Sequence, residues 1–369
     1  MLIAHKIELR PTKEQADYLS RCIGHSRDVY NKLLHHYSQD NMKWSKKSAR
    51  AYAVQLRATT CTYYDEISAD FIREAINDLD SGYRNFFSRV QKGEKKVGYP
   101  NYRKLGVDDV CALRDKKKFR VDSDGLRFEK FNKRTTDSPI KLREKIKYSG
   151  KIKQMNISRR AGKYYCSFLI DTQDYNPKDV ERYKSVGVDF GVKNLAICSN
   201  GKVFPANQKL KASLKRLARK QRRLAKQAKG SNRRAKTKLA IQKLHKHIAD
   251  QRAATIHELS DYLTSHFDRI VIEDLNVSGM LKNRKLSRAI ADCGFYELRR
   301  QLEYKAKWRN CELIVADRFF ASSKLCSHCH YKNPDVVLGV DDWTCPECGT
   351  WHDRDFNASI NLDNYPLAA

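Results

Sequence analysis

The stretch Ser185-Val186-Gly187-Val188-Asp189-Phe190-Gly191-Val192-Lys193-Asn194 lies just past the midpoint of the 369-residue chain. Its valines predict a buried strand that ends at Asp189. Gly187 and Gly191 mark places where the backbone bends or admits a close neighbour. A lone strand-end aspartate is compatible with a turn residue as well as with a metal ligand. Its role therefore depends on acids supplied by other parts of the chain.

Two other stretches supply such acids. The run Arg269-Ile270-Val271-Ile272-Glu273 predicts a second buried strand ending in an acid, and Trp351 to Leu362 predicts a helix with Asp353 and Asp355 near its start. Each acid taken alone also suits a turn or a helix cap. Acids that end neighbouring strands, joined by one from a packed helix, cannot all stay ionised without cations. Two Mg²⁺ ions about 3.5–4 Å apart would neutralise them and could activate water for attack on a phosphodiester.

Two cysteine pairs predict a second metal site. Cys326-x-x-Cys329 and Cys345-x-x-Cys348 are separated by fifteen residues, the spacing of a zinc ribbon. The alternative is four unrelated free thiols, like the seven cysteines scattered over the rest of the chain. Four thiolates leave no open position on the ion, so we expect a structural Zn²⁺ rather than a catalytic one.

The charge of the chain indicates a polyanionic partner. Its 73 Lys and Arg residues exceed 43 Asp and Glu, giving a formal net charge of +30. Nucleic acid is the leading candidate and an anionic membrane surface the rival. No apolar run approaches the ~20 residues of a membrane span, and the N-terminus has no signal-peptide core. We therefore expect a cytoplasmic protein without a membrane partner.

The strongest basic segment follows the first acidic strand. Three short strands, Val186–Asp189, Leu195–Cys198 and Lys202–Phe204, lead into two helices around Gly230-Ser231-Asn232, and no Asp or Glu occurs between Asp189 and Asp250. These helices could present a solvated face, but without acids they repel themselves unless they lie along phosphates. Their apolar seam is predicted to consist of Leu210, Leu214, Leu217, Leu224, Leu239, Leu244 and Ile248.

The remaining segments fill in the expected architecture. Leu2 to Arg10 predicts a strand, and Thr12 with Gln15 a capping box opening a helix that Gly24 ends. The pair of helices around Gly24 has the outline of a helix-turn-helix, but such a hairpin is more often just a packed pair of helices. Ala69 to Val90 predicts an amphipathic helix, and Val107 to Asp174 a small antiparallel barrel that the first strand joins. Later, a helix is expected over Ala289 to Trp308 and a strand over Glu312 to Val315.

Several of these motifs together resemble the TnpB family of transposon-encoded RNA-guided nucleases, which is related to type V CRISPR effectors. The resemblance is carried by Gly187-Val188-Asp189-Phe190-Gly191, Ile272-Glu273-Asp274-Leu275-Asn276, Asp353-Arg354-Asp355-x-Asn357-Ala358, Asp317 to Cys326 and Tyr99-Pro100-x-Tyr102. It covers essentially the whole chain. Ser359 stands where the family often has alanine.

The resemblance implies a multidomain α+β protein. It would have an RNase H-like (RuvC) α/β nuclease core with a zinc ribbon, and a WED β-barrel carrying an inserted helical REC domain. The expected boundaries are 1–10 and 107–183 for WED, 11–106 for REC, 184–322 and 350–369 for RuvC with its helical pair at 207–265, and 323–349 for the zinc ribbon.

The resemblance also implies the chemistry. Asp189, Glu273 and Asp355 would bind two catalytic Mg²⁺ ions, with Asp353 as the runner-up for the third position. The partners would be a guide RNA from the transposon end and target double-stranded DNA, cut next to a short adjacent motif by a monomer bound to one RNA in a prokaryotic cytoplasm. Two alternatives stay open: an RNA-guided repressor that does not cleave, and a cut-and-join transposase.

Overall fold

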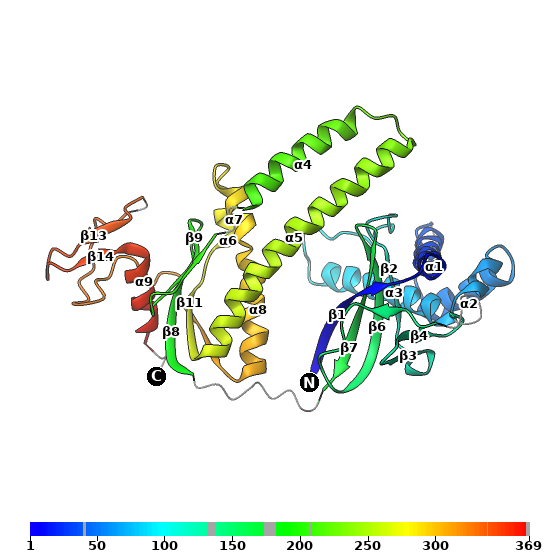
Figure 1. Ribbon diagram of the computed structural model, residues 1–369, viewed down its shortest axis with the longest axis horizontal. Helices are drawn as coiled ribbons and strands as arrows, with labels where there is room; N and C mark the ends of the chain where they lie inside the picture. The colour runs from blue at the N-terminus through cyan, green and yellow to red at the C-terminus, as the bar shows by residue number, and fades with distance from the viewer. Residues whose placement is uncertain (40–41, 132–137, 173–181, 207–208, 338, 367–369) are drawn as a thin grey trace. The chain divides into compact units, whose positions relative to one another are not determined.

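The computed structural model describes residues 1–39, 42–131, 138–172, 182–206, 209–337 and 339–366, with side chains omitted for 209–212. The chain divides into two compact units, Met1–Tyr175 and Asn176–Ala369 (Figure 1). Each unit has hydrophobic cores of its own. No helix in the described ranges is long and apolar enough to cross a membrane.

The first unit is built on an antiparallel sheet with the strand order β2-β6-β7-β1-β5. The N-terminal strand joins this sheet as predicted, pairing Ile3 with Ile170 of β7. A separate β3-β4 hairpin is linked toward β5 by one bridge, Leu126 to Ile140. The strands are β1 (Leu2–Arg10), β2 (Val110–Leu113), β3 (Phe119–Asp122), β4 (Gly125–Phe128), β5 (Lys141–Leu142), β6 (Lys151–Arg160) and β7 (Lys163–Asp171).

Helices inserted between β1 and β2 complete this unit. They are α1 (Lys13–Tyr37), α2 (Lys46–Ala58) and α3 (Ala69–Gln91), with a 3₁₀ turn, η1 (Thr62–Glu66). Thr12 and Gln15 form the predicted capping box. The expected break at Gly24 is wrong, because α1 runs through it without interruption. A glycine in the middle of a helix costs only about 1 kcal/mol relative to alanine, which the buried face of a 25-residue helix outweighs.

The second unit is a mixed sheet with the order β10-β9-β8-β11-β12. Strands β8, β9 and β10 form the predicted antiparallel meander, whereas β8, β11 and β12 run parallel. Their bounds are β8 (Tyr183–Asp189), β9 (Asn194–Cys198), β10 (Val203–Pro205), β11 (Phe267–Glu273) and β12 (Glu312–Ala316).

Helices cover both faces of this sheet (Figure 1). Ile270 and Ile272 of β11 pack with residues of α5 (Asn232–His266) and α8 (Phe295–Arg309), whereas Val271 packs with Leu362 of α9 (Arg354–Asp363). This alternation follows from the two-residue period of a strand. The second unit is therefore a three-layer α/β/α arrangement.

Two helix predictions in this unit need correction. The helix expected over Ala289 to Trp308 is divided into α7 (Ser287–Cys293) and α8 by Gly294, whose φ is +67°. Trp351 to Asp353 is not helical but forms β14, which pairs with β13 (Asp342–Thr344). Only from Arg354 does the chain enter α9.

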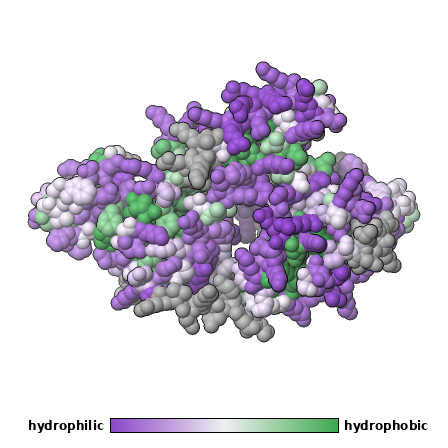
Figure 2. All heavy atoms as spheres, in the orientation of Figure 1, coloured by the Kyte–Doolittle hydropathy of each residue, from purple (hydrophilic) through white to green (hydrophobic). Residues whose placement is uncertain are grey.

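The two basic helices pack against each other as predicted. Leu214, Leu217 and Leu224 of α4 (Lys209–Ala225) contact Ile241, Leu244 and Ile248 of α5. Leu239 is 37% exposed, so its place in the predicted seam is wrong; the side chain of Leu210 lies outside the described part. Figure 2 shows hydrophilic side chains over the outer end of this hairpin.

Candidate active site and nucleic-acid interface

Asp189 and Glu273 end neighbouring parallel strands. Strand β8 finishes at Asp189 and β11 at Glu273, and Val188 aligns with Ile272 one residue earlier. Because the carboxyl ends of parallel strands meet at one edge of a sheet, the two acids reach the same edge.

Asp355 reaches this edge because α9 lies directly against β8. A Cβ atom placed on Gly187 would lie 2.0 Å from the carbonyl oxygen of Ser359 and 2.2 Å from the nitrogen of Asp363. Asp355 lies about one helical turn before Ser359, and Asp189 two strand residues beyond Gly187. Only glycine permits this approach, which brings the first turn of α9 to the end of β8.

The surroundings of Asp189 and Glu273 penalise their ionised forms. Burial, followed by the charges of Glu273 and Asp355, raises the pKa of Asp189 well above its usual value. Burial also raises the pKa of Glu273, although a hydrogen bond from Ser322 opposes this effect. A site that resists ionisation in this way favours divalent cations, which stabilise the carboxylates by binding them.

Arg354 is a cation next to these acids that sequence reasoning missed. Its Nη2 lies 2.7 Å from Oδ1 of Asp355, and its charge lowers the pKa values of both Asp189 and Glu273. Arg354 directly precedes Asp355 in the chain, and no sequence pattern marks an arginine at that position as a site residue.

Asp353 and Asp355 have different positions. Asp353 is the exposed N-cap of α9, and its Oδ1 accepts a hydrogen bond of 2.8 Å from the backbone nitrogen of Phe356. Asp355 is half-buried and acts electrostatically on Asp189 and Glu273. Asp353 raises the pKa of Asp189 too, but its effect is smaller than those of burial, Glu273 and Asp355.

Ser322 also was not predicted from the sequence as a site residue. Its hydroxyl donates a 2.7 Å hydrogen bond to Oε1 of Glu273, while its carbonyl oxygen accepts one of 2.7 Å from Asn361 of α9. The side chain of Glu273 is thus oriented by a residue that α9 holds in place. No pattern of spacing in the sequence singles out such a serine.

The four predicted cysteines come together. The Sγ atoms of Cys326, Cys329, Cys345 and Cys348 lie within 4.8 Å of one another, with Cys326–Cys348 and Cys329–Cys345 at 3.6 Å. Zn–S bonds of about 2.3 Å in a tetrahedron require sulfurs about 3.8 Å apart, so the cluster could bind zinc. Among the described residues no other group of three or more His, Cys, Asp or Glu side chains is assembled in this way. The carboxylate oxygens of Asp189, Glu273 and Asp355 are therefore not assembled as closely as the four cysteine sulfurs.

The cysteine cluster is tied to the acids through α9. Asn357 donates a 2.7 Å hydrogen bond to the carbonyl oxygen of Leu325 and accepts one of 2.9 Å from the nitrogen of Ser327, on either side of Cys326. Nε2 of His352 lies 3.1 Å from Sγ of Cys326. The segment that holds the cysteines is thus anchored two residues after Asp355.

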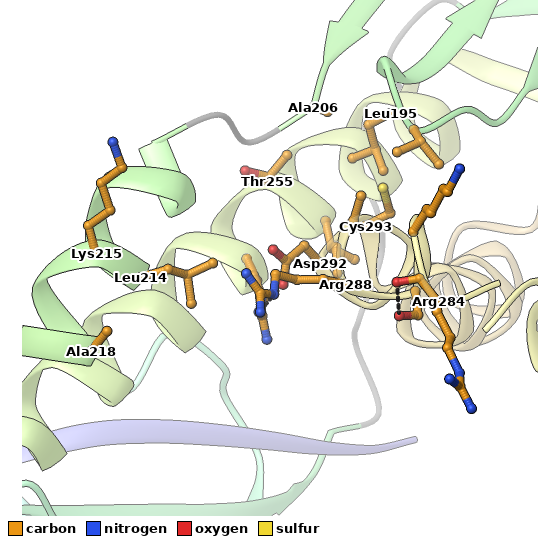
Figure 3. A pocket seen from close by; sticks show the side chains of 16 residues that line it. Leu195, Ala206, Leu214, Lys215, Ala218, Thr255, Arg284, Arg288, Asp292 and Cys293 are labelled. Carbon is orange, nitrogen blue, oxygen red and sulfur yellow. Dashed lines mark hydrogen bonds and ion pairs between the residues drawn. The ribbon is translucent and has the colours of Figure 1, made fainter. Parts of the chain in front are cut away.

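A basic hollow of about 1140 Å³ opens beside the loop that follows Asp189 (Figure 3). Val192 and Leu195 form part of its wall, and Lys215, Arg284 and Arg288 line it from other elements. None of these three cations pairs with a carboxylate of the described residues, whereas Arg252 pairs with Asp292. A second hollow of about 680 Å³ is lined by Arg219, Lys220, Arg223, Arg233 and Lys236 of α4 and α5.

Comparison with known proteins identifies the family. A family model described as "Probable transposase" matches residues 167–284, one for the TNB domain of Cas12f1-like proteins matches 295–362, and one for a helix-turn-helix domain matches 1–43. A "Putative RNA-guided DNA endonuclease" of Streptomyces pristinaespiralis is 34% identical over 375 residues, covering 99% of this chain and 90% of that protein. The chain belongs to the TnpB family.

Other relatives agree with this membership. A protein of Escherichia coli (strain K12) with the same description, named InsQ, is 29% identical over 98% of this chain and 91% of its own length. The CRISPR-associated endodeoxyribonuclease Cas12f1 of Sulfoacidibacillus thermotolerans is 25% identical over 55% of this chain and 50% of its own. In this TnpB chain the described part of the segment matched by the helix-turn-helix model contains β1 and the uninterrupted helix α1.

Proposed function

We propose that this TnpB-family protein is an RNA-guided DNA endonuclease that hydrolyses target DNA at Asp189, Glu273 and Asp355. The observation that carries the proposal is the delivery of acids from β8, β11 and α9 to one edge of the sheet, where burial and mutual repulsion raise the pKa values of Asp189 and Glu273. The relatives named above as RNA-guided DNA endonucleases support the same interpretation.

In this proposal the three carboxylates would hold Mg²⁺. When bound there, the ion would lower the pKa of a water molecule that it binds and would stabilise negative charge on the phosphate. Asp189 and Glu273 fit this role because their ionised forms are costly without a cation. Ser322 keeps one carboxylate oxygen of Glu273 in a fixed direction. Arg354 balances negative charge beside Asp355.

The rest of the chain would bind and position nucleic acid. We assign residues 184–322 and 350–369 to a RuvC nuclease domain, 1–10 and 107–183 to WED, 11–106 to REC, and 323–349 to a ribbon stabilised by Zn²⁺. Cations of α4, α5 and α7 that pair with no carboxylate of the described residues would supply phosphate contacts. A guide RNA would read the target sequence by base pairing.

The decisive experiment uses the protein purified with the RNA that accompanies it. Matched DNA duplexes carrying a library of flanking sequences are incubated with this complex in Mg²⁺ or in EDTA. We expect hydrolysed breaks that require Mg²⁺ and one flanking motif, and that the Asp189→Ala variant abolishes. Binding without cleavage would support the repressor alternative, and strand joining the transposase alternative.

A further inference from the structure

Phe319 is the most exposed large apolar side chain among the described residues, with 89% of its surface open to solvent. The neighbouring Phe320 instead packs beside the small core formed by Val271, Ala316 and Leu362. An exposed phenylalanine ring contributes little to folding. Its face is open to a binding partner.

The turn that presents Phe319 is held firmly. The backbone nitrogen of Phe319 donates a 2.8 Å hydrogen bond to Oδ1 of Asp317. The backbone nitrogen of Asp317 in turn donates one of 3.1 Å to the hydroxyl of Tyr365. The rings of Phe320 and Tyr365 meet edge to face at 4.9 Å. The Phe319 ring is thus projected by a fixed turn.

The same turn adjoins the proposed catalytic carboxylates. Arg318 pairs with Asp274, the residue after Glu273, and Ser322 hydrogen-bonds Glu273 itself. Glu273, Arg318 and Ser322 line a single hollow of about 210 Å³. Phe319 lies between Arg318 and Ser322 in sequence, so the turn that carries it adjoins this hollow, although Phe319 itself does not line it.

We propose that Phe319 stacks on an unpaired base of the DNA strand whose phosphate is bound at the carboxylates. This inference rests on the function proposed above. A strand that reaches these carboxylates from a duplex must leave its complement, and its bases then lose their stacking neighbours. An aromatic ring replaces that contact for any base, because every base has a π-face.

The surroundings favour a base over a protein surface. The turn that carries the ring also carries two charged residues, Asp317 and Arg318, and Arg318 pairs with Asp274. A stable protein interface buries about 800 Å² on each partner and has an apolar centre. One ring among charged groups offers no such centre, whereas a base presents a flat face and polar edges.

The test combines a protein variant with a modified DNA. Cleavage rates of the RNA-bound protein are measured on matched duplexes that carry one abasic position, moved stepwise past the cut. We expect Phe319→Ala to slow cleavage of unmodified DNA by roughly 5- to 100-fold, and Phe319→Trp to preserve it. One abasic position should slow the wild-type protein equally but cause no additional loss in Phe319→Ala.

A second measurement does not depend on cleavage. In the Asp189→Ala background, the fluorescence of 2-aminopurine at that position should stay quenched when the complex forms, because the Phe319 ring replaces the lost base stacking, and Phe319→Ala should remove this quenching. The matched control is Tyr183→Ala, because Tyr183 is 66% exposed and begins β8, at the opposite end of the strand from Asp189. We expect this control to cleave at the wild-type rate.

The outcomes separate the two proposals. If the wild-type complex cleaves DNA but Phe319→Ala matches it at every abasic position, the stacking role is wrong and the nuclease function stands. An equal loss in Tyr183→Ala, or quenching that persists in Phe319→Ala, would also overturn it. If the wild-type complex cleaves no matched duplex, the proposed function itself fails.

Discussion

Gly187 of β8 and Ser359 of α9 are in backbone contact, so close that a Cβ on the glycine would fall 2.0 Å from the serine carbonyl oxygen. The amide of Gly187 in turn donates a 3.1 Å hydrogen bond to Ser199, whose hydroxyl donates one of 2.8 Å to Asp363 of α9. The missing side chain therefore sets the distance between the strand that carries Asp189 and the helix that carries Asp355.

We expect Gly187→Ala to destabilise the second unit by roughly 3 kcal/mol, because neither backbone can move away without breaking the sheet or the helix. Thermal denaturation measures this loss. Gly24→Ala is the matched control, because Gly24 lies inside α1 and an alanine Cβ there would meet no atom of the surrounding structure within 4 Å. Alanine should therefore stabilise α1 by about 0.5–1 kcal/mol. Equal thermal stability of Gly187→Ala and wild type would contradict the contact.

The two acids at the start of α9 should behave differently when replaced. Replacing a residue that only orients a metal ligand lowers metal affinity or activity about 10–100-fold. Asp355→Asn would alter a direct ligand, so it should slow cleavage at least about 100-fold. Asp353→Ala removes a helix cap and should cost about 1 kcal/mol of stability while cleavage persists below the lowered melting temperature. The reverse pattern would assign the third position to Asp353.

The sequence predicts the strands of the site well, since Val186 to Asp189 and Ile270 to Glu273 are apolar runs that end in acid. It also predicts the cysteine cluster, because ligand spacing is a local property of the chain. The identity of the third acid follows less directly: Asp353 and Asp355 are two residues apart, and only the start of α9 at Arg354 makes one a cap and the other a half-buried neighbour of Asp189.

Features that depend on tertiary contact could not be predicted in this way. Ser322 and Arg354 act through partners that the fold supplies. The expected effect of glycine was wrong at both positions: tertiary packing carries a helix through Gly24, whereas Gly294, inside an expected helix, ends one with φ of +67°. The same residue type thus ends a helix only where the fold uses its left-handed conformation.

Stability of the metal-free protein should depend on pH through Asp189. Because folding raises the pKa of this carboxyl, the native state holds its proton more tightly than the unfolded chain does. The contribution of Asp189 to stability is therefore greatest below the unfolded pKa of about 4 and is lost as pH rises through the folded value. Denaturation in EDTA across this range should reveal the loss, which Asp189→Asn should reduce and Mg²⁺ should offset. A pH dependence identical in Asp189→Asn and wild type would contradict this account.

Removal of the metal from the cysteine cluster should affect cleavage as well as the ribbon. Cys345→Ser should lower the zinc content, measured by elemental analysis, and loosen the segment that Asn357 anchors through Leu325 and Ser327. Since Asn357 lies two residues after Asp355, cleavage should fall together with zinc content. Cys311→Ser, outside the cluster, should retain both. Full activity of a zinc-free protein would separate the ribbon from the site.

Neutralising cations on the α4–α5 hairpin should weaken nucleic-acid binding in a salt-dependent manner. Arg223 and Arg233 line one hollow and pair with no carboxylate among the described residues. Each phosphate contact contributes about 0.7–0.9 to the slope of log K against log salt. Arg223→Gln with Arg233→Gln should therefore make that slope less steep by about 1.4–1.8 if both contact phosphates.

The matched control is the pair Arg57→Gln and Arg89→Gln. These arginines already pair with Asp65 and Glu94, so their replacement should change the slope less. Binding of the copurified RNA across a salt titration measures both, and an unchanged slope in the hairpin variant would show that these cations face solvent.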